Sequence, residues 1–154
     1  MSDELDETDL KILRIVQSHP AMPVSEVAKL VALSHTPCWR RLKRMESLGL
    51  IVGRFTQLNA RALGLTVCVF AHIRLKQHDQ QAIEALEKAM LAHKEILECF
   101  STSGESDFIL RIIARNIEEY ERFLKQVLLH LPGIGSVNSS FALKCVKLTS
   151  ELPI

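Results

Sequence analysis

The chain has 154 residues, of which 47% are apolar, 24% are charged and 5% are aromatic, and its formal net charge is +1. These proportions are close to those of an average globular protein, and they exclude a disordered tail, a collagen-like repeat and a coiled-coil rod. The low aromatic content argues against a platform that stacks single-stranded bases. The longest apolar stretch, residues 62–73, is interrupted by Thr66 and His72. It is too short to cross a bilayer, so we expect no membrane partner.

Residues 6–60 have the pattern of helices. Asp6 is expected to cap a first helix, because an aspartate oxygen accepts free backbone N–H groups at a helix start. Apolar residues at helical spacing between Leu10 and Val16 provide its buried side, and Pro20 and Pro23 end it.

A second short helix is expected at Val24–Val31, followed after about three residues by a third helix that Ser34 caps and Gly49 ends. The third helix has two different faces. Its apolar arc holds Cys38, Leu42, Met45 and Leu48, and its polar arc holds Thr36, Arg40, Lys43 and Arg44. Arg41 falls inside the apolar arc, so we expect it to pair with an acid of the first helix. A short helix, a tight turn and a capped amphipathic helix form the helix-turn-helix pattern.

Positive charge is concentrated in this region. Between His35 and Arg61 there are six basic residues and one acid, Glu46. A basic patch in a nearly neutral protein is typical of a partner with a phosphate backbone, although charge alone also fits a solvated helix face. Leu50–Asn59 is expected to be a short extended stretch, either a wing or a linker. The predicted DNA-binding domain is therefore 1–60, with a wing or linker over 51–62.

The pattern changes from Ala62 onward. Thr66–Leu75 is an almost continuous apolar run of the kind found in a buried strand. A helix is expected at Asp79–His93, followed by strands at 96–103 and 108–114 joined by a tight turn.

A last helix is expected to begin at Asn116, with Glu119 at a capping-box spacing, and to end at Pro132-Gly133. Its predicted apolar stripe consists of Ile117, Tyr120, Leu124, Val127 and Leu131. A final strand is expected at Ser139–Leu148. The predicted fold class is therefore α+β, with a winged helix-turn-helix followed by a ferredoxin-like β-α-β-β-α-β domain over 63–154. Two helices cover only one face of such a sheet, so the other face predicts a homodimer.

The chain resembles the Lrp/AsnC family of transcription regulators over nearly its whole length. Its N-terminal matches are Leu5-Asp6-x-x-Asp9, Leu33-Ser34-x-Thr36-Pro37-Cys38-Trp39-Arg40-Arg41-Leu42-Lys43-Arg44 and Leu48-Gly49-Leu50-Ile51. Its C-terminal matches are Gly104-x-x-Asp107-Phe108-Ile109-Leu110, Leu131-Pro132-Gly133, Ser139-Ser140-Phe141 and Leu152-Pro153. Pro23 departs from the pattern, because relatives often place a Ser or Thr cap there. The resemblance implies a dimer that assembles into octamers, and a free amino acid bound between dimers that alters DNA binding or assembly.

The DNA-binding residues predicted from charge, cap and resemblance lie at the cap and along the third helix. They are Ser34, His35, Thr36, Pro37, Trp39, Arg40, Lys43 and Arg44. We expect Arg40 to read a base, because an arginine holds guanine through two hydrogen bonds, whereas lysines mostly bind phosphates. Trp39 fits either a DNA contact or a packed wedge.

The residues predicted to bind the effector lie mainly in the turn between the middle strands. They are Ser101, Thr102, Ser103, Gly104, Glu105, Ser106, Asp107, Ser139 and Ser140. Backbone N–H groups of such a turn hold a carboxylate, and Asp107 offers a counter-charge for an ammonium group. Ser139 and Ser140 are expected to add hydroxyls from a neighbouring subunit. An ordinary hairpin turn is the competing interpretation.

Other chemistry has little support in the sequence. The cysteines (Cys38, Cys68, Cys99 and Cys145) are scattered, which favours core residues in a reduced, cytoplasmic protein over a redox sensor. The six histidines lack close ligand spacing, so no metal site is expected. No nucleophile–base pair or phosphate-binding glycine loop is present, so we expect neither an enzyme nor a cofactor.

The predicted function is a sequence-specific DNA-binding regulator of amino-acid metabolism or transport genes. Its partners are double-stranded DNA and a free amino acid such as leucine or methionine. The alternative is an architectural protein that wraps DNA with little ligand response.

Overall fold

The computed structural model describes residues 5–154, which divide into two compact units. The first unit consists of the chain up to Gln57 together with Lys147–Ile154, and the second is Leu58–Val146. The sequence predicts a boundary near residue 60 and keeps the last residues in the second domain. The structure instead groups those eight residues with the N-terminal helices.

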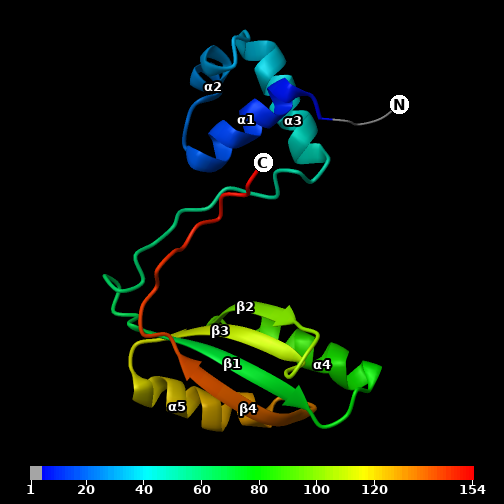
Figure 1. Ribbon diagram of the computed structural model, residues 1–154, viewed down its shortest axis with the longest axis vertical. Helices are drawn as coiled ribbons and strands as arrows, with labels where there is room; N and C mark the ends of the chain where they lie inside the picture. Colours follow the sequence, from blue (N-terminus) through cyan, green and yellow to red (C-terminus); the bar gives the residue numbers. More distant parts are fainter. Residues whose placement is uncertain (1–4) are drawn as a thin grey trace. The chain divides into compact units, whose positions relative to one another are not determined.

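The first unit is built from three helices, α1 (Glu7–Ser18), α2 (Val24–Leu30) and α3 (His35–Ser47) (Figure 1). The predicted cap of α1 is confirmed, because the Asp6 carboxylate accepts the N–H of Asp9 at 2.8 Å. Pro23 precedes α2 and supplies no side-chain cap.

A small apolar core holds these helices together. Its fully buried members are Ile12, Val27, Ala28, Cys38, Leu42 and Met45. The tight turn between α2 and α3 places Ala32 at a φ of 56°, a left-handed conformation that is uncommon outside glycine. The arrangement of a short helix, a turn and a two-faced α3 confirms the predicted helix-turn-helix.

The stretch after α3 follows one of the two predicted alternatives. Gly49, with a φ of 71°, follows the end of α3 as expected. Leu50–Asn59 contains no strand, so this stretch fits the predicted linker and has no wing strand.

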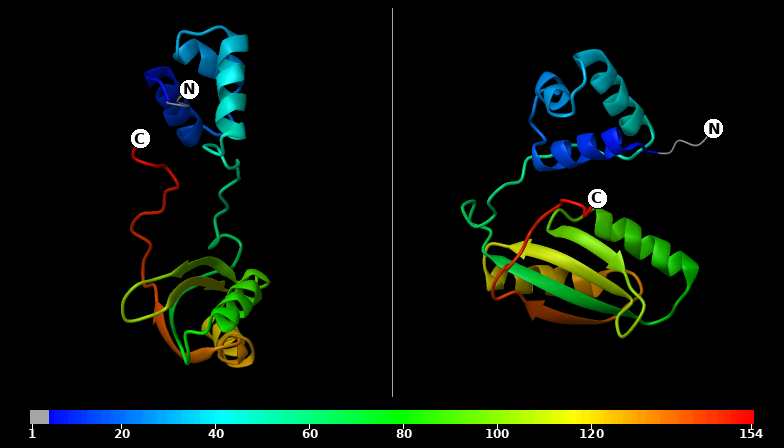
Figure 2. Two further views of the ribbon diagram at one scale, coloured as in Figure 1. Left: turned by 90° about the vertical axis from the view of Figure 1, so that its right-hand side faces the viewer. Right: turned by 45° about the horizontal axis from the view of Figure 1, so that its top comes forward.

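The second unit contains a four-stranded antiparallel sheet with the order β2-β3-β1-β4. Its elements are β1 (Val67–Leu75), α4 (Gln80–Leu91), β2 (Ile96–Ser101), β3 (Phe108–Ala114), α5 (Ile117–Gln126), a 3-10 turn (Leu128–His130) and β4 (Ile134–Phe141). Both α-helices lie on one face of the sheet (Figure 2). This is the predicted ferredoxin-like arrangement.

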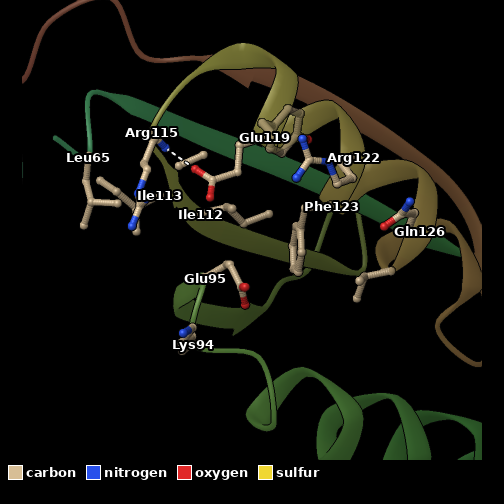
Figure 3. Close-up of a pocket in the computed structure, with 13 residues that line it drawn as sticks. Leu65, Lys94, Glu95, Ile112, Ile113, Arg115, Glu119, Arg122, Phe123 and Gln126 are labelled. Carbon is tan, nitrogen blue, oxygen red and sulfur yellow. Dashed lines mark hydrogen bonds between the residues drawn. The ribbon is translucent and has the colours of Figure 1, made fainter.

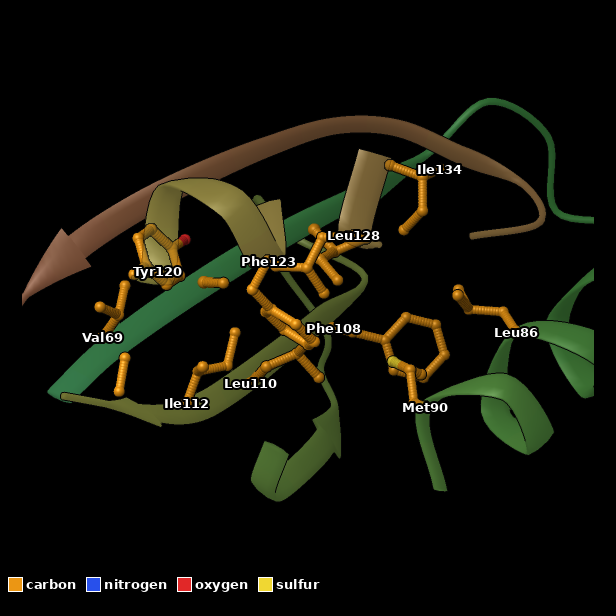
Figure 4. Close-up of a cluster of buried hydrophobic side chains, with 13 residues drawn as sticks. Val69, Leu86, Met90, Phe108, Leu110, Ile112, Tyr120, Phe123, Leu128 and Ile134 are labelled. Atoms are coloured by element: carbon orange, nitrogen blue, oxygen red, sulfur yellow. The ribbon is translucent and has the colours of Figure 1, made fainter. Parts of the chain in front are cut away.

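The main core of this unit lies between the sheet and its two helices (Figure 4). Alternate residues of β1 and β3 point into it, as the pleat of a strand requires. Its members include Val69, Ala71, Ile73, Leu86, Phe108, Leu110, Ile112, Tyr120, Phe123 and Leu128.

The predicted position of the last strand is wrong. It spans Ile134–Phe141 instead of Ser139–Leu148. Pairing with β1 explains the shift, because Phe141 lies opposite Val69 and β1 begins only two residues before it. Beyond that point the chain has no strand to pair with. At the other end, a Cβ on Gly135 would lie 3.0 Å from the Arg74 carbonyl oxygen, so glycine suits the bulge there.

Two other predictions need correction. Ile117, assigned to the apolar stripe of the last helix, is 59% exposed because it lies at the first turn, and Phe123 is buried in its place. Of the cysteines, Cys38 is buried as expected, but Cys99 and Cys145 are exposed. Cys145 also lies beyond β4, outside any strand.

The sheet face opposite α4 and α5 is called the open face. It carries Phe70, His72, Phe100, Ile109, Arg111 and Ile113. Phe70 is 37% exposed and Phe100 is 58% exposed. Arg111 makes two hydrogen bonds to the Glu98 carboxylate, at 2.8 and 2.9 Å, so its charge is neutralised locally. In residues 5–154 no helix is long and apolar enough to cross a membrane.

Candidate nucleic-acid interface and effector turn

Helix α3 presents the predicted DNA-binding residues on its solvent side. Cys38, Leu42 and Met45 turn inward and fix the helix on the small core. As a consequence, the opposite side faces water. All eight predicted residues are exposed: Ser34, His35, Thr36, Pro37, Trp39, Arg40, Lys43 and Arg44. Ser34 occupies the N-cap position, although its side chain makes no capping hydrogen bond.

The three cations of this surface have different surroundings. Within residues 5–154 the Arg40 guanidinium has no hydrogen bond or ion pair, so it is available to a partner. Lys43 forms an ion pair with Glu46 at 2.6 Å on the same helix. Arg44 donates to Asp9 at 2.8 Å. Arg40 is therefore the strongest candidate for reading a base.

A buried carboxylate joins α1 to α3. Asp9 is 1% exposed, and its two oxygens accept hydrogen bonds from Arg41 and Arg44, each at 2.8 Å. Arg41 also donates to Asp6 at 2.6 Å. The expected pairing of Arg41 with an acid of the first helix is thus confirmed. In the sequence Asp9 stands out only as part of the Leu5-Asp6-x-x-Asp9 match, and its central role depends on how the helices pack.

These contacts change the proton affinities of the groups involved. The pKa of the Asp6 carboxyl is lowered, first because it accepts the N–H of Asp9 and second because it accepts a hydrogen bond from Arg41. The pKa of Arg41 is raised by its bonds to Asp9 and Asp6. Asp6 and Arg41 are therefore ionised at neutral pH, and the hydrogen bond between them is charge-assisted.

The predicted effector turn connects β2 to β3. Thr102 closes it with two contacts, since its N–H donates to the Asp107 carbonyl at 2.9 Å and its hydroxyl donates to the Ser106 carbonyl at 2.6 Å. Gly104 has a φ of 139°, which a side chain rarely permits. Ser103, Gly104 and Glu105 are exposed at the tip.

Asp107 fixes this turn against β1. One carboxylate oxygen accepts the N–H of Leu75 at 2.7 Å, and the other lies 2.7 Å from Nε2 of His78. The pKa of Asp107 is lowered, mainly by the Leu75 N–H and next by His78. The side chain expected to hold an ammonium group therefore already binds the end of the central strand β1.

The two predicted serines of β4 lie apart from the turn. Ser139 is on the core side of the sheet, where its hydroxyl is hydrogen-bonded to the Tyr120 hydroxyl. Ser140 pairs with Phe70 and is on the open face. One chain therefore does not bring all the predicted effector residues together, which is consistent with their assignment to different subunits.

A separate pocket of about 520 Å³ lies beside α5, and none of the predicted effector residues lines it. Ile112 and Phe123 form an apolar floor, and the charged groups of Arg115, Glu119 and Arg122 surround it (Figure 3). It lies at the end of β3 opposite the effector turn. A seven-residue strand spans roughly 20 Å, so the two locations are clearly separate.

Comparison with known proteins assigns both units to described families. Residues 5–52 match a family of winged helix-turn-helix DNA-binding domains, and residues 68–152 match the Lrp/AsnC ligand binding domain. The chain is 31% identical to the DNA-binding transcriptional activator DecR of Escherichia coli K12, over 97% of this chain and 99% of that one. It is 34% identical to the leucine-responsive regulatory protein of Haemophilus influenzae, over 96% and 89%.

Solved structures agree with this assignment. A transcriptional regulator of Neisseria meningitidis in complex with L-methionine matches with a TM-score of 0.93 and 31% identity, over 97% of both chains. An AsnC family regulator of Agrobacterium tumefaciens matches with a TM-score of 0.91 and 36% identity, again over 97% of both. The chain therefore belongs to the Lrp/AsnC family of DNA-binding transcription regulators.

Proposed function

We propose that this regulator reads its operator with the solvent side of α3 and that a free amino acid, bound at the turn 101–107, alters its affinity for DNA. The observation that carries the DNA part is Arg40, whose guanidinium has no hydrogen bond or ion pair within residues 5–154, on a helix whose other side is held to α1. A rigid helix with a free guanidinium suits readout of a guanine in the major groove.

The effector assignment is supported by the chemistry of the turn. Gly104 and its neighbours expose backbone at the tip, where N–H groups suit a carboxylate. Asp107 supplies negative charge beside it. The relative solved with L-methionine and the leucine-responsive relative favour these two amino acids as effectors. Ser139 and Ser140 are assigned to the same site through a second subunit.

We also assign the open face to a homodimer, which then assembles into an octamer. Phe70, Phe100 and Ile109 leave apolar surface in water on a sheet whose other face is fully covered. Pairing two such faces buries this surface in the way that sheets stack in sandwiches.

DNA binding is tested by fluorescence anisotropy on the operator and on random duplex. Arg40→Ala should weaken operator binding by about 1–3 kcal/mol, the value of a bidentate base contact, and should weaken random-duplex binding much less. Arg122→Ala removes the same charge from the second unit and serves as the matched control. An equal loss on both duplexes would reduce Arg40 to a phosphate contact.

The effector site is tested by thermal shift and DNA binding with each amino acid. Asp107→Ala should abolish the response but also removes the acceptor for the Leu75 N–H. Asp107→Asn keeps an acceptor for the Leu75 N–H but removes the charge and the oxygen beside His78. His78→Ala, which removes only the second contact, should keep the response if the charge of Asp107 is what binds the ammonium group. Arg122→Gln alters the pocket of Figure 3 and should respond normally. A wild-type protein that responds to no amino acid favours the architectural alternative.

A further inference from the structure

The last residues of the chain are hydrogen-bonded to the first helix. The Gln17 side chain makes two bonds to the backbone of Leu152, since its amide nitrogen donates to the carbonyl at 3.0 Å and its oxygen accepts the N–H at 2.9 Å. The Arg14 guanidinium donates to the backbone oxygen of Ile154 at 2.8 Å. These contacts explain why 147–154 belongs to the first unit.

The contact between the C-terminal segment and α1 is mainly polar. Gln17 satisfies both backbone groups of one residue, as a neighbouring strand would. In contrast, the side chains add little burial, because Leu152 is 65% exposed and Ile154 is 43% exposed. Hydrogen bonds that exchange with water contribute little net free energy each, so this segment docks without being locked in place.

The docked segment is close in sequence to β4 of the second unit. The chain leaves the first unit after Gln57 and returns to it at Lys147, so the two units are connected twice. Only residues 142–148 separate the end of β4 from residue 149. Ser139 and Ser140, assigned above to the effector site, lie in the last three residues of β4.

On the other side, α1 is coupled to the DNA-reading helix. Asp9 lies on α1 two turns before Gln17, and its carboxylate holds Arg41 and Arg44 of α3. A continuous set of contacts therefore runs from the C-terminal segment through α1 to α3.

We propose that residues 149–154 form a latch on α1 that transmits the state of the second unit to α3. This inference rests on the proposed effector function. When the latch is docked, the DNA-binding unit is held by two connections, the linker after α3 and the segment after β4. When the latch is released, only the linker after α3 restricts this unit. An effector that displaces β4 changes the docking equilibrium, because the docked segment is tethered to that strand by a few residues.

The test uses full-length Gln17→Ala and Gln17→Glu, with Lys11→Ala as the control. Gln17 is preferred to Arg14 because Arg14 also pairs with Glu7. Lys11 is exposed and lies six residues before Gln17 on the same helix, and within residues 5–154 it has no hydrogen bond or ion pair to the segment. Affinity for L-methionine and L-leucine is measured by calorimetry, and the ratio of operator affinities with and without each amino acid by anisotropy.

Amino-acid affinity should be unchanged in Lys11→Ala and should shift in Gln17→Ala, because an effector that changes the docking equilibrium is itself affected by the docking. The ratio of operator affinities should fall toward one in Gln17→Ala and keep its wild-type value in Lys11→Ala. Gln17→Glu should be intermediate, since the carboxylate still accepts the Leu152 N–H but has no donor for its carbonyl. A full wild-type ratio in Gln17→Ala would refute the latch, and so would an equal reduction in Lys11→Ala.

Hydrogen exchange of the 147–154 peptide separates failure of the latch from failure of the proposed function. The peptide should exchange slowly in the wild type, fast in Gln17→Ala, and at a changed rate when the effector binds. If neither amino acid changes the operator affinity of the wild type, the proposed effector function is wrong. The exchange rates of wild type and Gln17→Ala still show whether the segment docks on α1. Equal exchange rates of the 147–154 peptide in wild type and Gln17→Ala would refute the docking of the segment on α1.

Discussion

At the scale of single residues, the decisive feature is the contrast between Arg40, which has no partner in the described part of the chain, and Arg44, which is held by Asp9. Both are exposed cations on α3 and look equivalent in the sequence. Because Asp9 is buried and both its oxygens are occupied, it orients Arg41 and Arg44 against α1. We infer that Arg44 contributes mainly to the placement of α3, and Arg40 to the reading of DNA.

Removing the charge of Asp9 should therefore destabilise the first unit. Asp9→Asn leaves two guanidinium groups without their shared carboxylate. Breaking a buried ion pair costs about 3–5 kcal/mol, and we expect about 2–3 kcal/mol here because the Arg41 and Arg44 side chains are 32% and 41% exposed. Urea unfolding measures the change. Glu46→Gln, which breaks the exposed pair with Lys43, should cost less than about 1 kcal/mol.

The lowered pKa of Asp6 predicts a pH dependence with a definite sign. The unfolded carboxyl titrates near pH 4, and the folded one below that. The unfolded state thus binds more protons in between, so the stabilisation is complete above about pH 4 and is lost as the pH falls through the folded pKa. Asp6→Asn keeps the cap but not the charge. Its free energy of unfolding should be below that of the wild type at pH 7 and should converge with it at low pH.

At the scale of elements, the caps and strand pairs decide where the structure begins and ends. Asn116 accepts the N–H of Glu119 at 2.8 Å and so starts α5, which carries Tyr120 and Phe123 into the core. β4 shows the opposite case. It contains a glycine, an asparagine and three serines, yet it is a strand because β1 pairs with it.

The cap of α5 predicts a measurable cost. Asn116→Ala should lower the free energy of unfolding by about 1 kcal/mol, because one N–H at the helix start loses its partner. Lys125→Ala, in the last turn of the same helix, removes only the exposed pair with Glu121 and should have a smaller effect. Equal losses in denaturant unfolding would show that the cap is unimportant.

At the scale of the whole molecule, the open face accounts for the assembly that we propose. Ile109→Arg places a charge at its centre and should convert the dimer into monomers, because a buried unpaired charge is costly. Leu143→Arg, at a residue that is 95% exposed and outside the sheet, should leave the dimer intact. Analytical ultracentrifugation distinguishes the two. Dimers in both variants would assign the subunit interface to another surface.

Local signals in the sequence were sufficient for much of this architecture. The periodicity of α1 and α3, the caps at Asp6 and Asn116, and the β-rich run of β1 are properties of short segments, and each is found where it was predicted. The exposed, charged side of α3 followed for the same reason, because a helix of known period separates apolar from charged residues without any knowledge of its neighbours.

What only the tertiary structure decided depends on residues distant in sequence. The end of β4 is set by the length of β1, and the role of Asp9 by the packing of α1 on α3. The docking of Leu152 on Gln17 joins residues 135 positions apart. Such contacts form only when the chain has closed on itself, so no local pattern of side chains encodes them.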